Sequence, residues 1–284
     1  MEKIHIFADS ACDIPQALVE KYKIEIVPVQ VMHEGRTFRE YYDITPQAYW
    51  RLLAESEEIP STAQVSLSQL LDAYRRAHQA GVTHMLGIIM NAKGSGGFQS
   101  ACMARDMFYE EYGRGMKIEL VDSETYTMIY GRVILDAAQM RDKGDSFDAI
   151  LGVVRSRLKR CEAVLGVYNL KFLRRSGRIS GGAAFVGEAL GLKPISHVYA
   201  GEVKVCGKAR GEKNLIPAMI DFVNGRVLNP EQQTAGLLYG DVSENRIAEL
   251  EKRLYGLGFP KVERWPIGVS VITNTGPQAL AVMY

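Results

Sequence analysis

The sequence predicts an α/β protein that is divided into two domains. Apolar strands alternate with amphipathic helices over the first part of the chain, and shorter strands follow after residue 162. The chain has 284 residues, which exceeds the usual size of one domain. Because alternating strands and helices are typical of a parallel sheet covered on both faces, we expect such a sheet in residues 1–162 and an α+β domain in residues 163–284.

A buried strand at residues 4–8 opens the first domain and ends at Asp9 and Ser10. We expect Asp13 and Pro15 to begin a helix next, because aspartate caps helix N-termini and proline fits the first turn. Apolar periodicity predicts the other elements: strands at 24–31, 85–90 and 118–121, and helices at 45–54, 67–80, 99–112, 127–143 and 147–160.

The second domain has shorter predicted strands. A stretch of apolar and small residues at 183–192 predicts either a core helix or the wall of an apolar tunnel. No long flexible linker separates the two domains, so we expect them to pack against each other. The remaining predictions are strands at 164–167, 194–198, 202–205, 234–239 and 262–266, helices at 215–224 and 243–255, and a final apolar stretch that Gly276 and Pro277 divide.

Composition and charge narrow the functional classes. The chain is 47% hydrophobic and 24% charged with a formal net charge of +1, so no overall field attracts nucleic acid or an anionic membrane. The N-terminus runs into a strand without the apolar core of a signal peptide, and no later run is long enough to span a bilayer. We therefore expect a cytoplasmic protein without stable membrane insertion. The four cysteines show no CxxC spacing, and the five histidines form no HExxH pair. We therefore expect neither a bound metal ion nor a cofactor.

Two predicted strands end in the same pair of residues, Asp9-Ser10 and Asp122-Ser123, just before a predicted helix. Because the carboxyl ends of parallel strands share one edge of the sheet, both pairs would lie on the same edge. Ligands bind at that edge in open α/β sheets, where helix N-termini gather. Each pair taken alone is equally well explained as an ordinary helix cap.

The glycine-rich segment 91–101 follows a predicted strand and precedes a predicted helix. Its small residues leave backbone amides free to meet an anion at the positive end of the helix. The segment is not a P-loop, because no Gly-Lys-Ser/Thr follows, and Ser95 lies in Gly-Ser-Gly rather than in a nucleophile elbow. An anion-binding loop and a plain glycine-rich turn both fit this pattern.

A second loop, at residues 60–66, is rich in hydroxyl groups. Ser66 is explained as the cap of the following helix, whereas Thr62 and Gln64 are not. The hydroxyls of Thr62 and Ser95, from separate loops, could together hydrogen-bond a carboxylate.

Three further turns carry polar or basic groups. Arg174, Arg175 and Arg178 lie beside glycines, and Arg210 lies in a similar turn at 208–211, so these arginines suit either recognition of an anion or a solvated turn. The turn predicted at 273–277 presents two hydroxyls and an amide.

No histidine lies close in sequence to Ser95, Thr62 or Thr275, so these polar groups have no evident general base. Polar anchors beside apolar stretches indicate binding rather than catalysis. An amphiphile fits such a site, because each buried CH₂ of its tail contributes about 0.8 kcal/mol while the hydroxyls orient its head.

Taken in order, these segments resemble the DegV family of fatty-acid-binding proteins over nearly the whole chain. The resemblance implies a Rossmann-like N-terminal domain packed on a second α/β domain, with one long-chain fatty acid between them and no enzymatic activity of the chain itself. The segments that carry it are 8–15, 27–29, 60–66, 94–101, 121–123, 173–180, 193–195 and 208–211.

The resemblance also implies a binding site. Thr62 and Ser95 match the residues that hold the acid's carboxylate in that family, with Gly96, Asn274 and Thr275 beside them. Arg178 and Arg210 match arginines that assist the head group or dock a partner. Some members present the acid to a separate fatty acid kinase, so such a kinase is an implied partner. Asn274 stands where the family commonly has histidine, and asparagine cannot become cationic.

Two other functions compete with a fatty-acid carrier. One is an enzyme that acts on a phosphorylated or carboxylated metabolite with Ser95 as nucleophile. The other is a regulator that senses a lipid in the same pocket and binds a protein partner.

Overall fold

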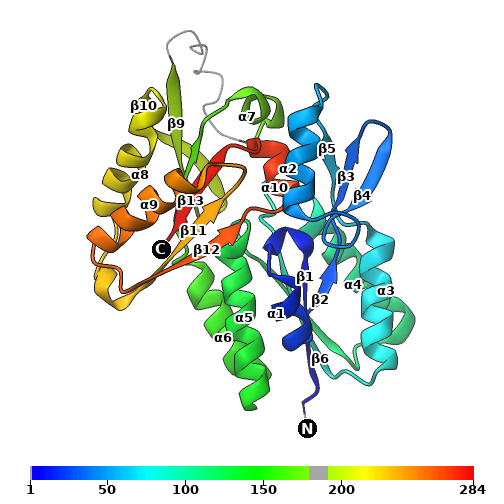
Figure 1. Cartoon of the computed structure of the whole chain (residues 1–284). Coiled ribbons are helices and arrows are strands. Elements are labelled where there is room, and N and C mark those ends of the chain that lie inside the picture. The colour runs from blue at the N-terminus through cyan, green and yellow to red at the C-terminus, as the bar shows by residue number, and fades with distance from the viewer. Residues whose placement is uncertain (1, 179–190) are drawn as a thin grey trace.

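The computed structural model describes residues 2–178 and 191–284, which form three β-sheets with helices around them (Figure 1). Figure 1 shows the six-stranded sheet and its outer helices on one side of the molecule and the four-stranded sheet on the other. The boundary predicted at residue 162 falls in the short connection between α6 (Phe147–Leu158) and β8 (Ala163–Val167).

The four-stranded sheet is parallel throughout, in the order β2-β1-β6-β7. Alternate residues of its strands face opposite helical layers, as the predicted α/β architecture requires. The side chains of Phe7, Met85 and Ile89 pack against α3 and α4. The strands are β1 (Ile4–Asp9), β2 (Glu25–Val27), β6 (His84–Ile89) and β7 (Lys117–Asp122), and their helices are α1 (Gln16–Lys21), α3 (Leu67–Gln79), α4 (Gly97–Tyr112), α5 (Met128–Lys143) and α6.

The six-stranded sheet has the order β10-β9-β8-β13-β11-β12 and is antiparallel except for the β11–β12 pair. One face packs on α8 and α9, and the other contributes Val198, Leu238 and Ala281 to the core shared with α5. Its elements are β8, β9 (Leu192–Tyr199), β10 (Glu202–Arg210), β11 (Thr234–Tyr239), β12 (Lys261–Pro266), β13 (Ala279–Met283), α8 (Leu215–Asn224) and α9 (Glu244–Gly256), with the short helices α7 (Lys171–Ser176) and α10 (Val269–Thr275) beside it.

A small antiparallel sheet, β4-β3-β5, lies with α2 (Pro46–Glu55) beside α10. Its strands are β3 (Gln30–His33), β4 (Arg36–Arg39) and β5 (Ser61–Ala63). The single strand predicted at 24–31 is therefore wrong: the chain leaves the parallel sheet at Pro28, which has no N–H for a ladder, and enters a different sheet.

Three other local predictions are also wrong. Asp13 does not cap the N-terminus of α1: its φ of 54° lies in the left-handed region, where it ends the 3-10 helix Ser10–Cys12, and its carboxylate accepts a hydrogen bond from the Gly268 amide at 2.8 Å. Residues 171–176 form a helix rather than a solvated turn, and residues 273–275 end a helix rather than form an open turn. Most of the apolar stretch predicted at 183–192 lies outside the described residues.

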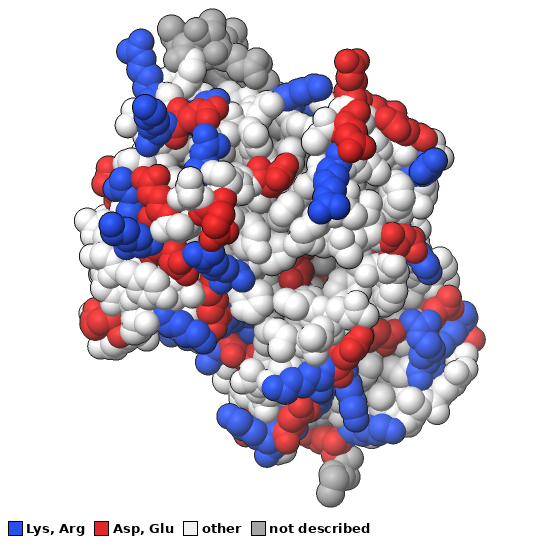
Figure 2. All heavy atoms as spheres, in the orientation of Figure 1, with Lys and Arg blue, Asp and Glu red and all other residues white. Residues whose placement is uncertain are grey.

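Lysines and arginines are interspersed with aspartates and glutamates over the face shown in Figure 2, as expected for a net charge of +1. Among the helices that the structure describes, none combines the length and the apolar character needed to cross a membrane. The four cysteines are all free, and no group of three potential metal ligands lies together in the described parts of the chain.

Candidate functional site: a cavity between the two large sheets

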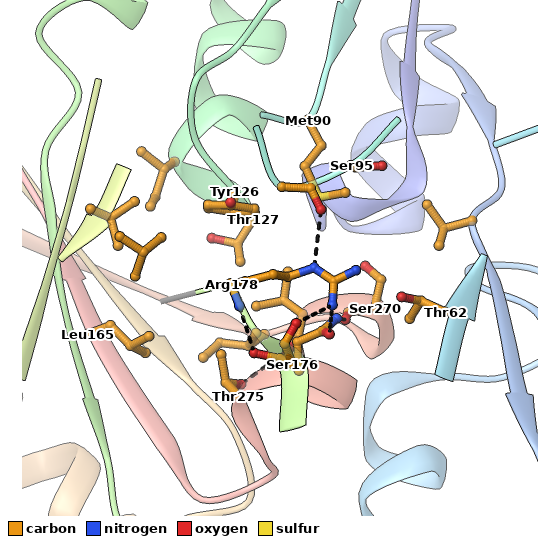
Figure 3. Close-up of a pocket in the computed structure, with 18 of the residues that line it drawn as sticks. Thr62, Met90, Ser95, Tyr126, Thr127, Leu165, Ser176, Arg178, Ser270 and Thr275 are labelled. Atoms are coloured by element: carbon orange, nitrogen blue, oxygen red, sulfur yellow. Dashed lines mark hydrogen bonds between the residues drawn. The ribbon is translucent and has the colours of Figure 1, made fainter. Parts of the chain in front are cut away.

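A cavity of about 420 Å³ lies between the carboxyl ends of β6 and β7 and the inner face of the six-stranded sheet. This volume is within the range of small-molecule sites. Thr62 and Ser95 lie on one side of the view in Figure 3, and Leu165 lies on the opposite side. Polar groups therefore gather toward one end, and apolar side chains line the other: Ile129, Ala163, Leu165, Val198, Val203, Leu238, Ile267 and Ala281.

Two carboxylates brace the segment that follows β6. Asp9, at the end of β1, accepts a hydrogen bond from the Met90 amide at 2.7 Å. Asp122, at the end of β7, accepts one from the Ala92 amide at 3.0 Å. Because β6 lies between β1 and β7, the two aspartates hold the same segment from both sides. The expectation that they share an edge is confirmed, and Asp9 is also the N-cap residue of the short 3-10 helix Ser10–Cys12.

Asn91 shapes the turn that carries Ser95. Its backbone carbonyl oxygen accepts hydrogen bonds from the backbone amides of Gly94, at 3.0 Å, and Ser95, at 3.1 Å. The Ser95 hydroxyl accepts one from the Gly97 amide at 3.2 Å, where α4 begins. Ser95 therefore lies at a helix N-terminus, whose partial positive charge favours an anion.

Two glycines in this turn are required by close contacts. A Cβ atom on Gly94 would lie 2.3 Å from the Tyr126 hydroxyl, and one on Gly96 would lie 2.0 Å from Gln64 Oε1. The Gln64 amide nitrogen also donates to the Ser100 hydroxyl at 2.9 Å, which ties the strand of Thr62 to α4. These contacts bring the two hydroxyl-bearing loops together at one wall of the cavity.

Thr62 lies in β5, where it pairs with Val31 of β3. Both Thr62 and Ser95 line the cavity. Within the described residues the Thr62 hydroxyl makes no hydrogen bond, so it is available to a ligand. The structure thus places both predicted hydroxyls at one cavity, and their part in binding stays a prediction.

Arg178 reaches the cavity from the residues that follow α7. Its Nε atom donates to the Gly94 carbonyl at 3.1 Å, and its Nη1 atom donates to Asn274 Oδ1 at 2.5 Å and to the Ser176 carbonyl at 3.3 Å. Figure 3 shows the guanidinium between Ser95 and the segment around Ser176 and Thr275. A permanent positive charge therefore lies at the polar end of the cavity.

Asn274 and Thr275 line the cavity from the last turn of α10. The Asn274 side-chain nitrogen donates to the Ser270 carbonyl at 2.8 Å, and the Thr275 hydroxyl donates to the Val271 carbonyl at 3.1 Å. Such bonds to the preceding turn explain why a run of polar residues forms a helix end here. Gly276 stops the helix, with φ of 85° and no room for a Cβ atom beside the Phe172 ring.

Arg210 lies away from this cavity. It is exposed at the end of β10, opposite Leu192 of β9, and it is not among the lining residues that the structure describes. The geometry therefore gives no support to a contact between Arg210 and a ligand's head group. A role in docking a partner stays a prediction.

Sequence reasoning missed a group of buried carboxylates behind α10. Glu40 accepts hydrogen bonds from the Ser270 amide and the Ser10 hydroxyl, both at 2.7 Å, while Asp13 holds the Gly268 amide. Burial raises the pKa of Glu40 and Asp13 above their ordinary values. It also raises the pKa of Asp9 to about 6, although hydrogen bonds from Tyr130 and Met90 oppose the shift. Asp9 and Asp13 lie in segment 8–15, which carries part of the family resemblance, whereas no motif in the sequence includes Glu40.

The geometry defines the class of protein as an α/β protein with an internal cavity between its two large sheets. One end of this cavity carries a helix N-terminus that favours an anion, and apolar side chains line the other end. The chain belongs to the DegV family, whose model, described as "Uncharacterised protein, DegV family", matches residues 3–284. The resemblance drawn from the motifs is thereby confirmed.

A DegV domain-containing protein of Caldanaerobacter subterraneus is 31% identical over 285 residues, which cover 100% of this chain and 99% of the relative. Among solved structures, one of fatty acid binding by a DegV family protein from Thermus thermophilus matches with a TM-score of 0.86 and 28% identity, covering 99% of this chain and 98% of the other. A stearic-acid-binding protein from Eubacterium ventriosum has the same fold, with a TM-score of 0.88, 24% identity, and coverage of 100% and 98%.

Proposed function

We propose that this protein binds one long-chain fatty acid in the cavity between its two large sheets and carries it as a non-enzymatic binding protein. The observation that carries the proposal is the position of Arg178, whose charge lies at the polar end of a cavity with apolar walls at the other. The 28% identical protein from Thermus thermophilus, whose structure is one of fatty acid binding, supports the same ligand.

The acid's carboxylate lies at the polar end in this proposal. The hydroxyls of Thr62 and Ser95 donate to it, the α4 N-terminus at Gly96 favours its charge, and Asn274 and Thr275 lie beside it on α10. Removing a carboxylate from water is costly unless an opposite charge accompanies it, and Arg178 supplies that charge. Asn274 keeps the Arg178 guanidinium in place through its side-chain oxygen.

The acyl chain lies along the apolar walls. Leu165 of β8 and Leu238 of β11 come from the six-stranded sheet, and Ile267 directly follows β12, so the acyl chain is buried against a preformed surface. Each CH₂ transferred from water contributes about 0.8 kcal/mol. Most of the affinity therefore comes from the tail, and the head-group contacts fix the orientation of the acid.

The histidines argue for a carrier over an enzyme with Ser95 as nucleophile. The Ser95 hydroxyl contacts the Gly97 amide rather than a base. Four histidines have polar partners other than Ser95: His5 contacts Glu25, His33 contacts Ser56, His84 contacts Thr83 and His197 contacts Glu162. His78 packs against the rings of Phe108 and Tyr112.

We further propose that the protein is cytoplasmic and presents the bound acid to a separate fatty acid kinase. Gly96 and Lys93 are exposed, so the polar end of the cavity lies near the surface while the apolar end is buried. A partner could therefore reach the carboxylate without removing the tail. Incubation of the loaded protein with such a kinase and ATP should give an acyl phosphate; a product that forms equally well from free acid would contradict the presenting role.

The binding proposal is tested by lipid extraction and mass spectrometry of the purified protein, followed by titration of the stripped protein with an 18-carbon acid. The double variant Thr62→Val with Ser95→Ala should weaken binding about 100-fold, because two hydrogen bonds to a charged group are lost. The control is Ser66→Ala, which removes the capping hydroxyl of α3 outside the cavity. Stripped parent protein that takes up no acid of any length would refute the proposal.

A further inference from the structure

The β9–β10 hairpin forms one wall of the cavity at the edge of the six-stranded sheet. Val198 and Val203 face each other across the hairpin, and both line the cavity. β10 is the edge strand, and β8 pairs with β9 only as far as Val198. The hairpin tip, residues 199–202, therefore extends beyond the sheet ladder and depends on other contacts to stay in place.

Polar contacts hold the hairpin tip. Ala200 and Gly201 form its turn with φ of 50° and 74°, as in a two-residue type I′ hairpin. The Gly201 amide donates to the Glu124 carbonyl at 2.9 Å, and the Gly201 carbonyl accepts from Asn91 Nδ2 at 3.0 Å. Lys93 Nζ donates to the Ala200 carbonyl at 3.3 Å. Tyr199, the largest side chain of the tip, is 41% exposed, so the tip buries little apolar surface.

Asn91 joins the hairpin tip to the head-group loop, which is the turn at residues 91–96 that carries Ser95. Its side chain is 1% exposed and donates to both Gly201 and the Tyr126 hydroxyl, the latter at 2.7 Å. Its backbone carbonyl holds the amides of Gly94 and Ser95. One buried residue therefore determines both the position of the tip and the shape of the loop that carries Ser95.

We propose that the hairpin tip is the gate of the cavity and that Asn91 couples its closure to capture of the ligand's carboxylate. The inference rests on the proposed function, because it assumes that an acyl chain must pass the cavity wall. A carboxylate bound at Ser95 restrains the loop and hence the Asn91 side chain, which then holds the tip closed over the tail. By linkage, a closed tip favours the bound head group to the same degree.

Displacing the hairpin tip should cost less free energy than displacing any other part of the cavity wall formed by the sheet. β8, β11 and β13 are paired on both sides, so their displacement would break two ladders each. Opening the tip breaks the few polar contacts to Asn91, Lys93 and Glu124, which water can replace. The irregular register between Val205 and Gly207 is a β-bulge, a feature that lets a strand bend there.

The first test measures exchange of cis-parinaric acid, a fluorescent 18-carbon fatty acid, by stopped flow. Asn91→Ala should raise the dissociation rate constant about tenfold and should also raise the association rate constant, because the closed state loses a buried hydrogen bond. Damage to the head-group loop alone would raise dissociation without faster association. The control is Lys193→Gln at the opposite end of the same hairpin, which removes the contacts with Tyr168 and Glu212 and does not line the cavity.

The second test locks the hairpin tip in its closed position with a covalent cross-link. Lys93→Cys and Ala200→Cys are introduced into a background in which Cys102, Cys161 and Cys206 are replaced by alanine, and a short bismaleimide joins them. Compared with the same protein before cross-linking, uptake of parinaric acid should slow at least tenfold and preloaded acid should be retained. Unchanged exchange after cross-linking, in protein that binds the acid, would overturn the gate alone. Parent protein that binds no parinaric acid would overturn both the proposed function and the gate.

Discussion

Arg178 and Asn274 show how one contact sets the chemistry at the polar end of the cavity. Asn274 keeps the guanidinium at the cavity through a 2.5 Å hydrogen bond and carries no charge itself. A histidine at this position would instead add a group that titrates near neutral pH. In this protein the positive charge at the site therefore comes from Arg178 and does not depend on pH.

Replacing Arg178 by glutamine should weaken fatty acid binding about tenfold, because the carboxylate loses its counter-charge at a site that is still open to water. Isothermal titration with an 18-carbon acid measures this change. The matched control is Arg175→Gln, an exposed arginine of the same segment that does not line the cavity. If both variants bind the acid as tightly as the parent protein, Arg178 does not contact the head group.

Asn274→His should make binding pH-dependent. A protonated imidazole beside the carboxylate adds a second positive charge, so affinity relative to the parent should rise as the pH is lowered from 7.5 to 5.5. Fluorescence titration of both proteins at the two pH values measures the ratio. A ratio that does not change with pH would mean that residue 274 does not approach the head group.

Gly96→Ala should destabilise the folded protein by about 1–3 kcal/mol, since the new methyl group displaces Gln64 from its contact with α4. Thermal unfolding of the stripped protein measures the loss. Gly115→Ala is the control, because a Cβ atom there meets nothing within 4 Å. If both variants unfold at the parent's temperature, the close approach of Gln64 to Gly96 is not a constraint in solution.

At the scale of elements, α10 is positioned by carboxylates rather than by apolar packing alone. Glu40 and Asp13 hold the amides of Ser270 and Gly268 at its first turn, and the Tyr49 hydroxyl contacts the Thr273 hydroxyl at 2.7 Å. These bonds cross from the N-terminal part of the chain to the helix that bears Asn274. The orientation of the proposed head-group site therefore depends on groups that are more than two hundred residues away in sequence.

The buried carboxylates predict how stability varies with pH. Burial raises the folded-state pKa of Asp9 from 3.8 to about 6, so the folded protein binds this proton more tightly than the unfolded chain. Stability should therefore rise as the pH falls from about 7.5 to about 5, by about 1 kcal/mol from Asp9 alone, with Asp13 and Glu40 acting in the same direction.

Urea unfolding at several pH values measures this dependence. Asp9→Asn should reduce the change in stability between pH 7.5 and pH 5, whatever its effect on absolute stability. A variant that is merely less stable would keep the parent's dependence on pH. An identical dependence in the variant and the parent would show that Asp9 does not titrate in this range.

At the scale of the whole molecule, both large sheets contribute residues to the wall of the cavity. A ligand bound in the cavity would contact both of them, so binding should stabilise the whole protein against unfolding. Loading with an 18-carbon acid at 100 times its Kd should add about 2.7 kcal/mol to the free energy of unfolding. Differential scanning calorimetry of stripped and loaded protein measures the rise in Tm. The methyl ester of the same acid is the control and should give a smaller rise, because it cannot present a carboxylate to Thr62 and Ser95. Equal shifts with acid and ester would contradict head-group capture.

The features of this protein that could be predicted from its amino-acid sequence are those that depend on local pattern. Alternating apolar strands and helices predicted the parallel sheet, and the ordered motifs predicted the DegV family. The paired Asp9-Ser10 and Asp122-Ser123 predicted the edge where the candidate site lies, because strand ends in a parallel sheet share one side.

The contacts between distant segments could not be predicted from the sequence and became visible in the folded structure. The bond between Arg178 and Asn274, the carboxylate of Glu40 behind α10, and the hairpin tip on Asn91 join residues separated by about a hundred positions or more. Periodicity and turn chemistry describe neighbours along the chain, whereas these contacts arise from how the sheets pack. The same packing placed residues 171–176 and 273–275 in helices where the local sequence favoured turns, because burial against other elements outweighs weak local preference.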